Sequence, residues 1–276
     1  MKYRLIAFDV DNTLIDHRKQ LTPRVEQSIK KAAAAGCNVV ISSGRSYVEC
    51  EELFKRLPEI RYFVGNSGST VMDAQNCEYL FSAAFTPDES RQVFEKLHGL
   101  DCMVTIHAGP WLYIENSARE NLAHYETDCY TGLFNASGTW IDSAEELAVS
   151  REDVFKIDIF FHSVEDKLAA EQSLKGFNAS MSGGTRTNLE LIPGKCTKGT
   201  GLQMLSKYLE IPIENVAACG DANNDISMIN AAGLGIAVGN ADDDLKAAAD
   251  VIVADCDHDG AAEAIEMILS ASAQSE

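Results

Sequence analysis

The feature that most limits the fold is a regular alternation of short apolar segments with amphipathic segments. Residues 5–8 read as a buried strand, and Thr22 followed by Pro23 predicts a helix start. That helix is expected to end near Gly36, before a strand at about 38–42. A helix over about 47–57 and a strand at 62–65 follow. Such alternation predicts a parallel sheet with right-handed crossover connections.

The alternation stops in the middle of the chain and resumes after the apolar run 188–193. In between, two predicted strands flank the turn signal at 108–110, as in an antiparallel hairpin. A further strand at 154–161 precedes a helical pattern. We predict a doubly wound, Rossmann-like α/β core over residues 1–83 and 187–276, with an inserted α/β domain over 84–186. Small residues at 82–84 and 182–184 are expected to be its hinges.

Composition excludes several classes of protein. The formal net charge of −19 argues against a nucleic-acid partner, because phosphate contacts depend on Lys and Arg. No apolar run is long enough for a signal-peptide core or a membrane span, so we expect no membrane partner and a cytoplasmic location. The eight cysteines are scattered, which predicts reduced thiols. Nothing in the sequence indicates the oligomeric state.

Two aspartates, Asp9 and Asp11, stand one residue apart directly after the first predicted strand. The carboxyl ends of strands are where open α/β sheets bind ligands. Taken alone, such a pair could equally be turn or helix-capping acids. Three other segments, 43–45, 195–202 and 220–228, also lie at predicted strand ends or helix starts. Their positions favour a functional site over turn or capping acids.

Together these segments resemble the four signature motifs of the haloacid dehalogenase superfamily of phosphohydrolases. Asp9-Val10-Asp11-Asn12-Thr13 matches the first motif, Ser43 the second, Lys198 the third, and the acidic segment from Gly220 the fourth. The long insertion resembles the cap of the Cof-type, class IIB, subfamily. Asn12 is a departure, since close relatives usually carry Gly there.

The resemblance implies the roles of four acidic residues. Asp9 would be the nucleophile that forms an aspartyl phosphate, and Asp11 the general acid and base. Mg²⁺ would be bound by Asp9, Asp221 and the backbone carbonyl of Asp11, with Asp225 binding it directly or through water. An EF-hand is excluded because Ile226 replaces the required Gly.

The net negative charge of the chain repels an anionic substrate. The binding pocket must therefore contain its own positively charged side chain to bind the phosphate. Lys198 is expected to provide it. A lysine at a helix start is ordinarily solvated, but a cation there opposes the helix dipole and its placement needs a reason. Ser43, the Gly44 amide and Asn224 are expected to donate hydrogen bonds to the phosphate oxygens.

The inserted domain offers substrate-contact candidates by residue type alone. These are His107, Trp111, Tyr113, Lys156 and Arg186. Arg45 is a further candidate, expected to point toward the site if it continues the Ser43 loop. Aromatic and histidine residues in strands are more often part of a core, so the alternative for each is a packing role.

The leading hypothesis is an enzyme, a Mg²⁺-dependent phosphatase of the haloacid dehalogenase type acting on small phosphorylated metabolites such as a sugar phosphate. A phosphomutase of the same superfamily is the first alternative, but it needs a second anion site. A receiver-like phospho-acceptor is the second, although receivers lack an inserted domain and the fourth motif. A binding protein with an inactive site is disfavoured because every expected side chain is present.

Overall fold

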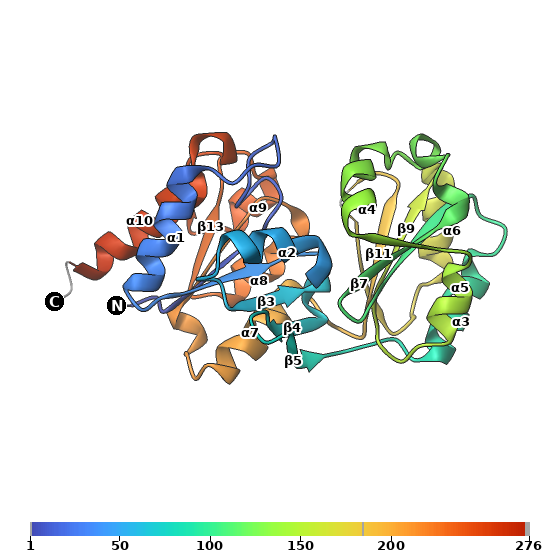
Figure 1. Ribbon diagram of the computed structural model, residues 1–276, viewed down its shortest axis with the longest axis horizontal. Helices are drawn as coiled ribbons and strands as arrows, with labels where there is room; N and C mark the ends of the chain where they lie inside the picture. Colours follow the sequence, from blue (N-terminus) through green and yellow to red (C-terminus); the bar gives the residue numbers. More distant parts are fainter. Residues whose placement is uncertain (1, 184, 274–276) are drawn as a thin grey trace. The chain divides into compact units, whose positions relative to one another are not determined.

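The computed structural model describes residues 2–183 and 185–273. It divides the chain into two compact units (Figure 1). The first contains the described residues up to Gly44, residues 51–81, and the described residues from Thr197 onward. The second contains residues 45–50 and the described residues of 82–196.

The first unit is built on an eight-stranded sheet in the order β14-β13-β12-β1-β2-β3-β4-β5. β1 pairs in parallel with both β12 and β2, and β4 is antiparallel to β3. Every residue of β1 is buried, as expected for a strand covered on both faces. The strands are β1 (Leu5–Phe8), β2 (Asn38–Ser42), β3 (Tyr62–Gly65), β4 (Thr70–Asp73), β5 (Glu78–Ser82), β12 (Val216–Gly220), β13 (Leu234–Ala237) and β14 (Val251–Ile252).

Helices complete this unit. α1 lies beside α10, and α7 packs against α8 (Figure 1). The Thr22 hydroxyl accepts a hydrogen bond from the Val25 amide and Pro23 is the first helical residue, so the predicted start of α1 is confirmed. The helices are α1 (Pro23–Ala34), α2 (Tyr47–Arg56, of which residues 51–56 belong to this unit), α7 (Lys198–Tyr208), α8 (Ile226–Ala231), α9 (Asp243–Ala248) and α10 (Gly260–Ala273).

The second unit is a six-stranded sheet in the order β10-β11-β9-β6-β7-β8. The predicted β6–β7 hairpin is confirmed, and β7 and β8 are parallel. One face buries an apolar core that includes Phe85, Ile157 and Phe161. The strands are β6 (Cys102–Ala108), β7 (Trp111–Glu115), β8 (Gly138–Ile141), β9 (Val154–Phe161), β10 (Ala179–Ser182) and β11 (Asn188–Pro193). The helices are α3 (Pro87–Leu97), α4 (Thr131–Ser137), α5 (Ala144–Val149) and α6 (Val164–Ser173).

The α/β fold with an inserted α/β domain is as expected, but the boundary at 186 is wrong. β11 forms antiparallel ladders with β9 and β10, so residues 187–196 belong to the second unit. A short apolar run fits a buried strand of either sheet, and only the pairing distinguishes them. The other boundary of the inserted unit lies between residues 81 and 82, two residues before the predicted one. Ser182 is inside β10 and not in a hinge, and Gly184 lies outside the described residues.

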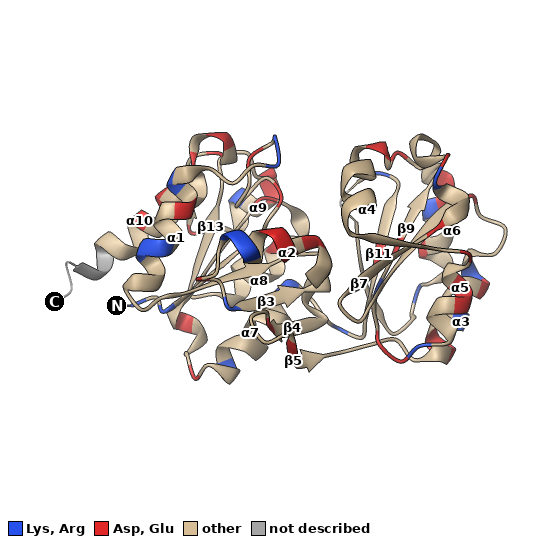
Figure 2. Ribbon diagram, viewed as in Figure 1, with Lys and Arg blue, Asp and Glu red and all other residues tan. Residues whose placement is uncertain are grey.

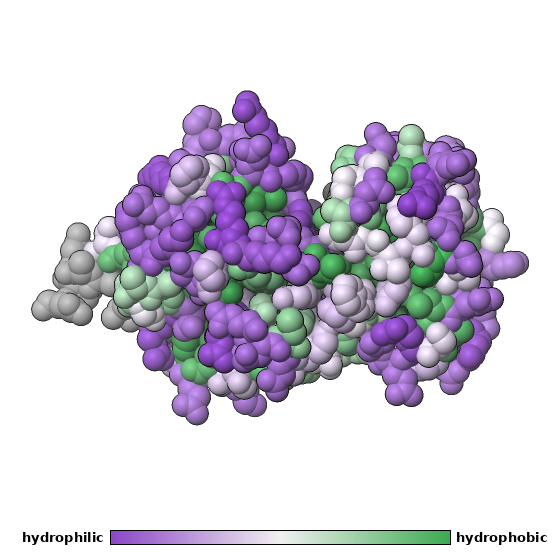
Figure 3. Space-filling view, viewed as in Figure 1, coloured by the Kyte–Doolittle hydropathy of each residue, from purple (hydrophilic) through white to green (hydrophobic). Residues whose placement is uncertain are grey.

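The surface is predominantly polar. Acidic residues outnumber basic ones by 42 to 23, and Figure 2 shows them on both units. The face drawn in Figure 3 is mostly hydrophilic, with smaller apolar areas. Among the described residues, the helices are all too short or too polar to cross a membrane.

Candidate active site

The neighbouring strands β12, β1 and β2 end at the same edge of the sheet. Three of the predicted site residues follow directly after these strand ends. In the sheet register, Phe8 of β1 lies opposite Cys219 of β12 and Ile41 of β2. The next residues along these strands lead to Asp9, Asp221 and Ser43. The Asp9 amide donates to the Cys219 carbonyl at 3.0 Å, which extends the ladder to the site. The strand order therefore gathers residues that are far apart in the sequence.

Lys198 reaches this edge from the first turn of α7. The Thr197 hydroxyl caps the helix by accepting from the Thr200 amide at 3.2 Å. Gly68 has φ of +96°, and a Cβ there would lie 1.9 Å from the Thr197 carbonyl oxygen. A glycine is therefore required for the helix start to approach so closely.

The Lys198 ammonium is an enclosed charge and not a solvated one. The residue is 1 % exposed, and Nζ donates to Asp9 Oδ1 and to Asp225 Oδ1, each at 2.6 Å. Burial alone would lower the pKa of Lys198, but attraction to Asp225 and Asp9 outweighs it and raises the pKa. The side chain therefore remains a cation, contrary to the solvated alternative.

Asp225 organises the turn that carries Asp221. It is fully buried, and its Oδ2 accepts from the amides of Asp221 at 3.0 Å and Ala222 at 3.1 Å. A Cβ at Gly220 would lie 2.6 Å from the Asp225 side chain. Asp225 thus connects Lys198 to the backbone after β12.

Asp11 and Asp221 have more exposed surroundings. Asp221 Oδ1 accepts from the Thr13 hydroxyl at 3.1 Å, and Thr13 is 1 % exposed. Lys19 Nζ contacts Asp11 Oδ1 at 2.8 Å. The sequence reasoning missed Lys19, because it lies eight residues beyond Asp11 in a polar loop and no motif marks it.

The site holds more negative than positive charge. Burial raises the pKa of Asp9 to about 8, with Lys198 opposing the shift and Asp225, Asp221 and Asp11 adding to it. Burial, together with the Asp225 charge, raises the pKa of Asp221 to about 6. The ionised carboxylates therefore need a further cation.

The donor set fits Mg²⁺. One carboxylate oxygen from each of Asp9, Asp221 and Asp225 can be chosen so that all lie within 4.8 Å of one another. Mg²⁺ prefers oxygen ligands from one or two carboxylates plus water and phosphate. Asp9 and Asp221 could therefore bind the ion directly, whereas both Asp225 oxygens already accept hydrogen bonds from Lys198 and from the amides of residues 221 and 222.

The remaining predicted phosphate-binding residues lie in the loops around this edge. Ser43 is 2 % exposed, its amide donates to the Val64 carbonyl at 2.8 Å, and its own carbonyl accepts from Ser67. Gly44 follows it directly. Asn224 lies in the short 3₁₀ helix Asn223–Asp225, between β12 and α8.

In the second unit, His107 and Lys156 belong to a buried ionic cluster on one face of the sheet. The two residues are register partners on β6 and β9. Asp158 Oδ2 lies 3.0 Å from His107 Nε2 and 2.9 Å from Lys156 Nζ. Burial alone would raise the pKa of Asp158, but Lys156 and His107 lower it overall. Glu49 lies 3.5 Å from His107 Nδ1.

The other candidates of this unit have different surroundings. Tyr113 packs against the apolar core on the opposite face, and Trp111, two residues earlier on β7, is 49 % exposed. Arg45 donates to the Glu49 carbonyl at 3.1 Å and is assigned to this unit rather than to that of Ser43. Arg186 lies in the exposed turn before β11.

Comparison with known proteins shows the family of this chain. The family model of haloacid dehalogenase-like hydrolases matches residues 6–265. Phosphatase YwpJ of Bacillus subtilis is 28% identical, over 96% of this chain and 100% of its own. Pyridoxal phosphate phosphatase YbhA of Escherichia coli is 27% identical, over 96% and 98%. A solved haloacid dehalogenase-like hydrolase from B. subtilis superposes with a TM-score of 0.85 at 26% identity, over 95% and 99%.

The fold, the family match and the phosphatases among the relatives define an enzyme that hydrolyses phosphoric monoesters. The chain belongs to the haloacid dehalogenase-like hydrolases, which the family model matches over almost its whole length. The resemblance to the Cof-type phosphatases of this superfamily is thereby confirmed.

Proposed function

We propose that this enzyme is a Mg²⁺-dependent phosphatase that hydrolyses small soluble phosphomonoesters through an aspartyl-phosphate intermediate. The observation that carries the proposal is the pair of 2.6 Å contacts that hold Lys198 between Asp9 and Asp225, beside Asp221. A cation fixed against a strand-end carboxylate suits the binding of a phosphate dianion next to a nucleophile.

Asp9 is the proposed nucleophile. Its Oδ1 accepts from Lys198, and among the described residues no hydrogen bond reaches Oδ2. Oδ2 attacks the phosphorus, the ester P–O bond breaks, and the phosphoryl group becomes attached to Asp9. Holding the carboxylate in one orientation removes part of the entropic barrier to this step.

Asp11 is the proposed general acid and base. It protonates the leaving oxygen as the ester bond breaks, and then takes a proton from the water that attacks the aspartyl phosphate. Lys19, bound to Asp11 Oδ1 at 2.8 Å, orients this carboxyl group. Such acid–base assistance is typically worth ~10²–10⁴-fold in rate.

The other residues neutralise charge. Asp9, Asp221 and the Asp11 carbonyl would hold Mg²⁺, and the bound ion would supply Lewis-acid stabilisation of the phosphoryl oxygens. Lys198, Ser43, the Gly44 amide and Asn224 bind the phosphate. Asp225 contributes by holding Lys198 and the amides of residues 221 and 222.

We further propose that the substrate is a small phosphorylated metabolite met in the cytoplasm, and that the inserted unit selects it. The relative YbhA, which is named for pyridoxal phosphate, supports a substrate of this small size. Arg45, His107, Trp111, Tyr113 and Arg186 remain predicted substrate contacts, with His107 favoured by its place in a buried charged cluster.

The test is a panel of phosphorylated metabolites scored for free phosphate with Mg²⁺ and with EDTA. We expect release with Mg²⁺ that EDTA abolishes and added Mg²⁺ restores. Asp9→Asn should remove turnover while circular dichroism stays unchanged, and Asp244→Asn, an exposed site on α9, is the matched control. Full turnover in metal-free buffer would rule out the proposed mechanism.

A further inference from the structure

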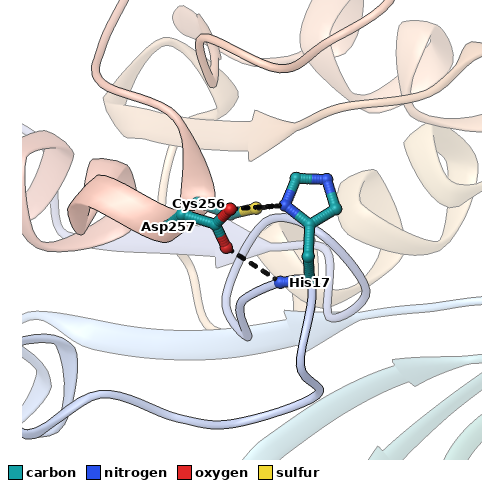
Figure 4. Close-up of side chains that lie close together, drawn as sticks. All are labelled: His17, Cys256 and Asp257. Carbon is teal, nitrogen blue, oxygen red and sulfur yellow. Dashed lines mark hydrogen bonds and ion pairs between the residues drawn. The ribbon is translucent and has the colours of Figure 1, made fainter.

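The first unit holds a second group of metal-ligating side chains, His17, Cys256 and Asp257. His17 Nδ1 lies 3.0 Å from Asp257 Oδ2 and 3.3 Å from Cys256 Sγ. One donor atom from each residue can be chosen so that all three lie within 4.8 Å of one another. Figure 4 shows them converging from a loop after β1 and from the short helix Cys256–His258.

This arrangement is not that of a catalytic relay. In such a relay the nucleophile and the carboxylate contact opposite nitrogens of the imidazole. Here the thiol and the carboxylate both lie at Nδ1. Burial also raises the pKa of the Cys256 thiol to about 11, whereas cysteine nucleophiles have a lowered pKa. Convergence of three donors on one point is instead the arrangement of a metal site.

We propose that His17, Cys256 and Asp257 bind a divalent transition-metal ion of the Zn²⁺ class, with solvent completing the coordination. Thiolate and imidazole ligands favour such ions over Mg²⁺ and Ca²⁺. Bonds of about 2.0–2.3 Å at tetrahedral angles place donor atoms roughly 3.4–3.6 Å apart. The two separations from His17 Nδ1, 3.0 Å to Asp257 Oδ2 and 3.3 Å to Cys256 Sγ, are a few tenths of an ångström shorter. Small rotations of the half-exposed His17 and Asp257 side chains would make up the difference.

Both segments are held in place by their own hydrogen bonds. Asp16 Oδ1 accepts from the amides of Arg18 at 2.9 Å and Gln20 at 2.8 Å, which fixes the turn around His17. The His17 amide donates to Asp257 Oδ1 at 3.1 Å. The Cys256 amide donates to Asn240 Oδ1 at 2.8 Å. Little reorganisation is therefore needed to bind an ion.

An ion at this cluster would crosslink two segments that border the candidate active site. Asn240 also donates to the Asn12 carbonyl at 2.8 Å, next to Asp11. Lys19, two residues after His17, holds Asp11. The proposed metal site of His17, Cys256 and Asp257 does not depend on the proposed phosphatase function. It can be tested without measuring activity.

The test is titration of the reduced 276-residue protein with Co²⁺ as a spectroscopic probe for Zn²⁺. We expect a thiolate-to-cobalt charge-transfer absorption, lost on addition of one equivalent of Zn²⁺. Cys256→Ser should remove the absorption. His17→Gln and Asp257→Asn should weaken binding at least ~100-fold, since even outer-shell changes typically cost ~10–100-fold. Competition with a chromogenic chelator measures the affinity.

Two controls separate this site from other ligands. Cys77→Ser removes an exposed thiol elsewhere, and His124→Gln disrupts the sulfur-free cluster of Asp101, His124 and His162. Both should leave the absorption unchanged. No thiolate absorption in the wild type, or one that survives Cys256→Ser, would overturn the proposal. Unaltered affinity in both His17→Gln and Asp257→Asn would do so as well, and these exposed sites keep the test valid whatever Cys256→Ser does to folding.

Discussion

Lys198 is a buried cation whose two partners, Asp9 and Asp225, are both carboxylates. At ~4 Å and an effective dielectric of ~20, one additional contact with a phosphate anion is worth about 4 kcal/mol before desolvation. Replacing Lys198 by Met keeps most of the volume and removes the charge. We expect kcat/KM to fall by several orders of magnitude, measured in steady-state assays.

The control for this variant is Lys207→Met, at the exposed last turn of the same helix. It should leave kcat/KM within a factor of about two, because it touches no site residue. A loss below tenfold in Lys198→Met would place Lys198 outside the reaction. Unfolding curves should accompany both variants, since an unpaired buried carboxylate is itself destabilising.

The acidic residues give the metal-free protein a characteristic pH dependence. The pKa of Asp221 is raised from 3.8 to about 6, so the folded state binds this proton more tightly than the unfolded state does. The contribution of Asp221 to stability therefore falls as pH rises from about 4 to 6, and the loss persists above that range. Asp221→Asn removes the titration and keeps the acceptor for Thr13.

In EDTA at pH 8 we therefore expect Asp221→Asn to be the more stable protein, by on the order of 1–3 kcal/mol. The difference should vanish near pH 4 and should shrink when Mg²⁺ is added to the wild type. Urea unfolding at several pH values measures it. A metal-free wild type that is more stable than the variant at pH 8 would contradict this account.

At the scale of elements, the start of α7 depends on a glycine in a different segment. Gly68→Ala would place a Cβ 1.9 Å from the Thr197 oxygen and would also strain a backbone with φ of +96°. We expect a loss of stability and a displaced Lys198, seen as lower kcat/KM. Gly36→Ala is the matched control, because its φ is +82° but no atom lies within 4 Å.

Gly36→Ala should cost only the backbone strain, about 1–2 kcal/mol. Gly68→Ala should cost ~1–3 kcal/mol more from overpacking. Chemical denaturation of both variants gives the comparison. Equal losses in the two would mean that the helix start does not need the close approach.

The elements of the core were largely predictable, because helix starts and apolar runs carry local signals. Thr22-Pro23 and Thr197 mark the starts of α1 and α7 in the sequence itself. β11 was misassigned because its sheet depends on pairing partners, which no local signal specifies. Lys19 was missed for the same reason, since its contact with Asp11 exists only once the loop folds back.

For the whole molecule, the division into two units separates the proposed chemistry from the proposed selectivity. The acidic site residues and Lys198 all belong to the first unit. Replacing residues 82–196 by a short Gly/Ser linker should leave weak hydrolysis of p-nitrophenyl phosphate. Activity on the best natural substrate should fall much further, because substrate contacts are lost.

Ranking the metabolite panel with both proteins is the measurement. Circular dichroism must show a folded core, and a core that aggregates calls for repeating the swap with a longer linker. A folded core with an unchanged substrate ranking would show that residues 82–196 do not select the substrate.

The position of β1 between β2 and β12 has a consequence for synthesis of the chain. At about 5–20 residues per second, ribosomes need roughly 10–40 s to proceed from β1 to β12. During that time one edge of β1 has no partner, while the whole inserted unit is made and is free to fold. An unpaired apolar edge is a site for wrong pairing with other chains. The nascent protein is therefore most vulnerable in that interval, and a chaperone that shields Leu5–Phe8 would act then.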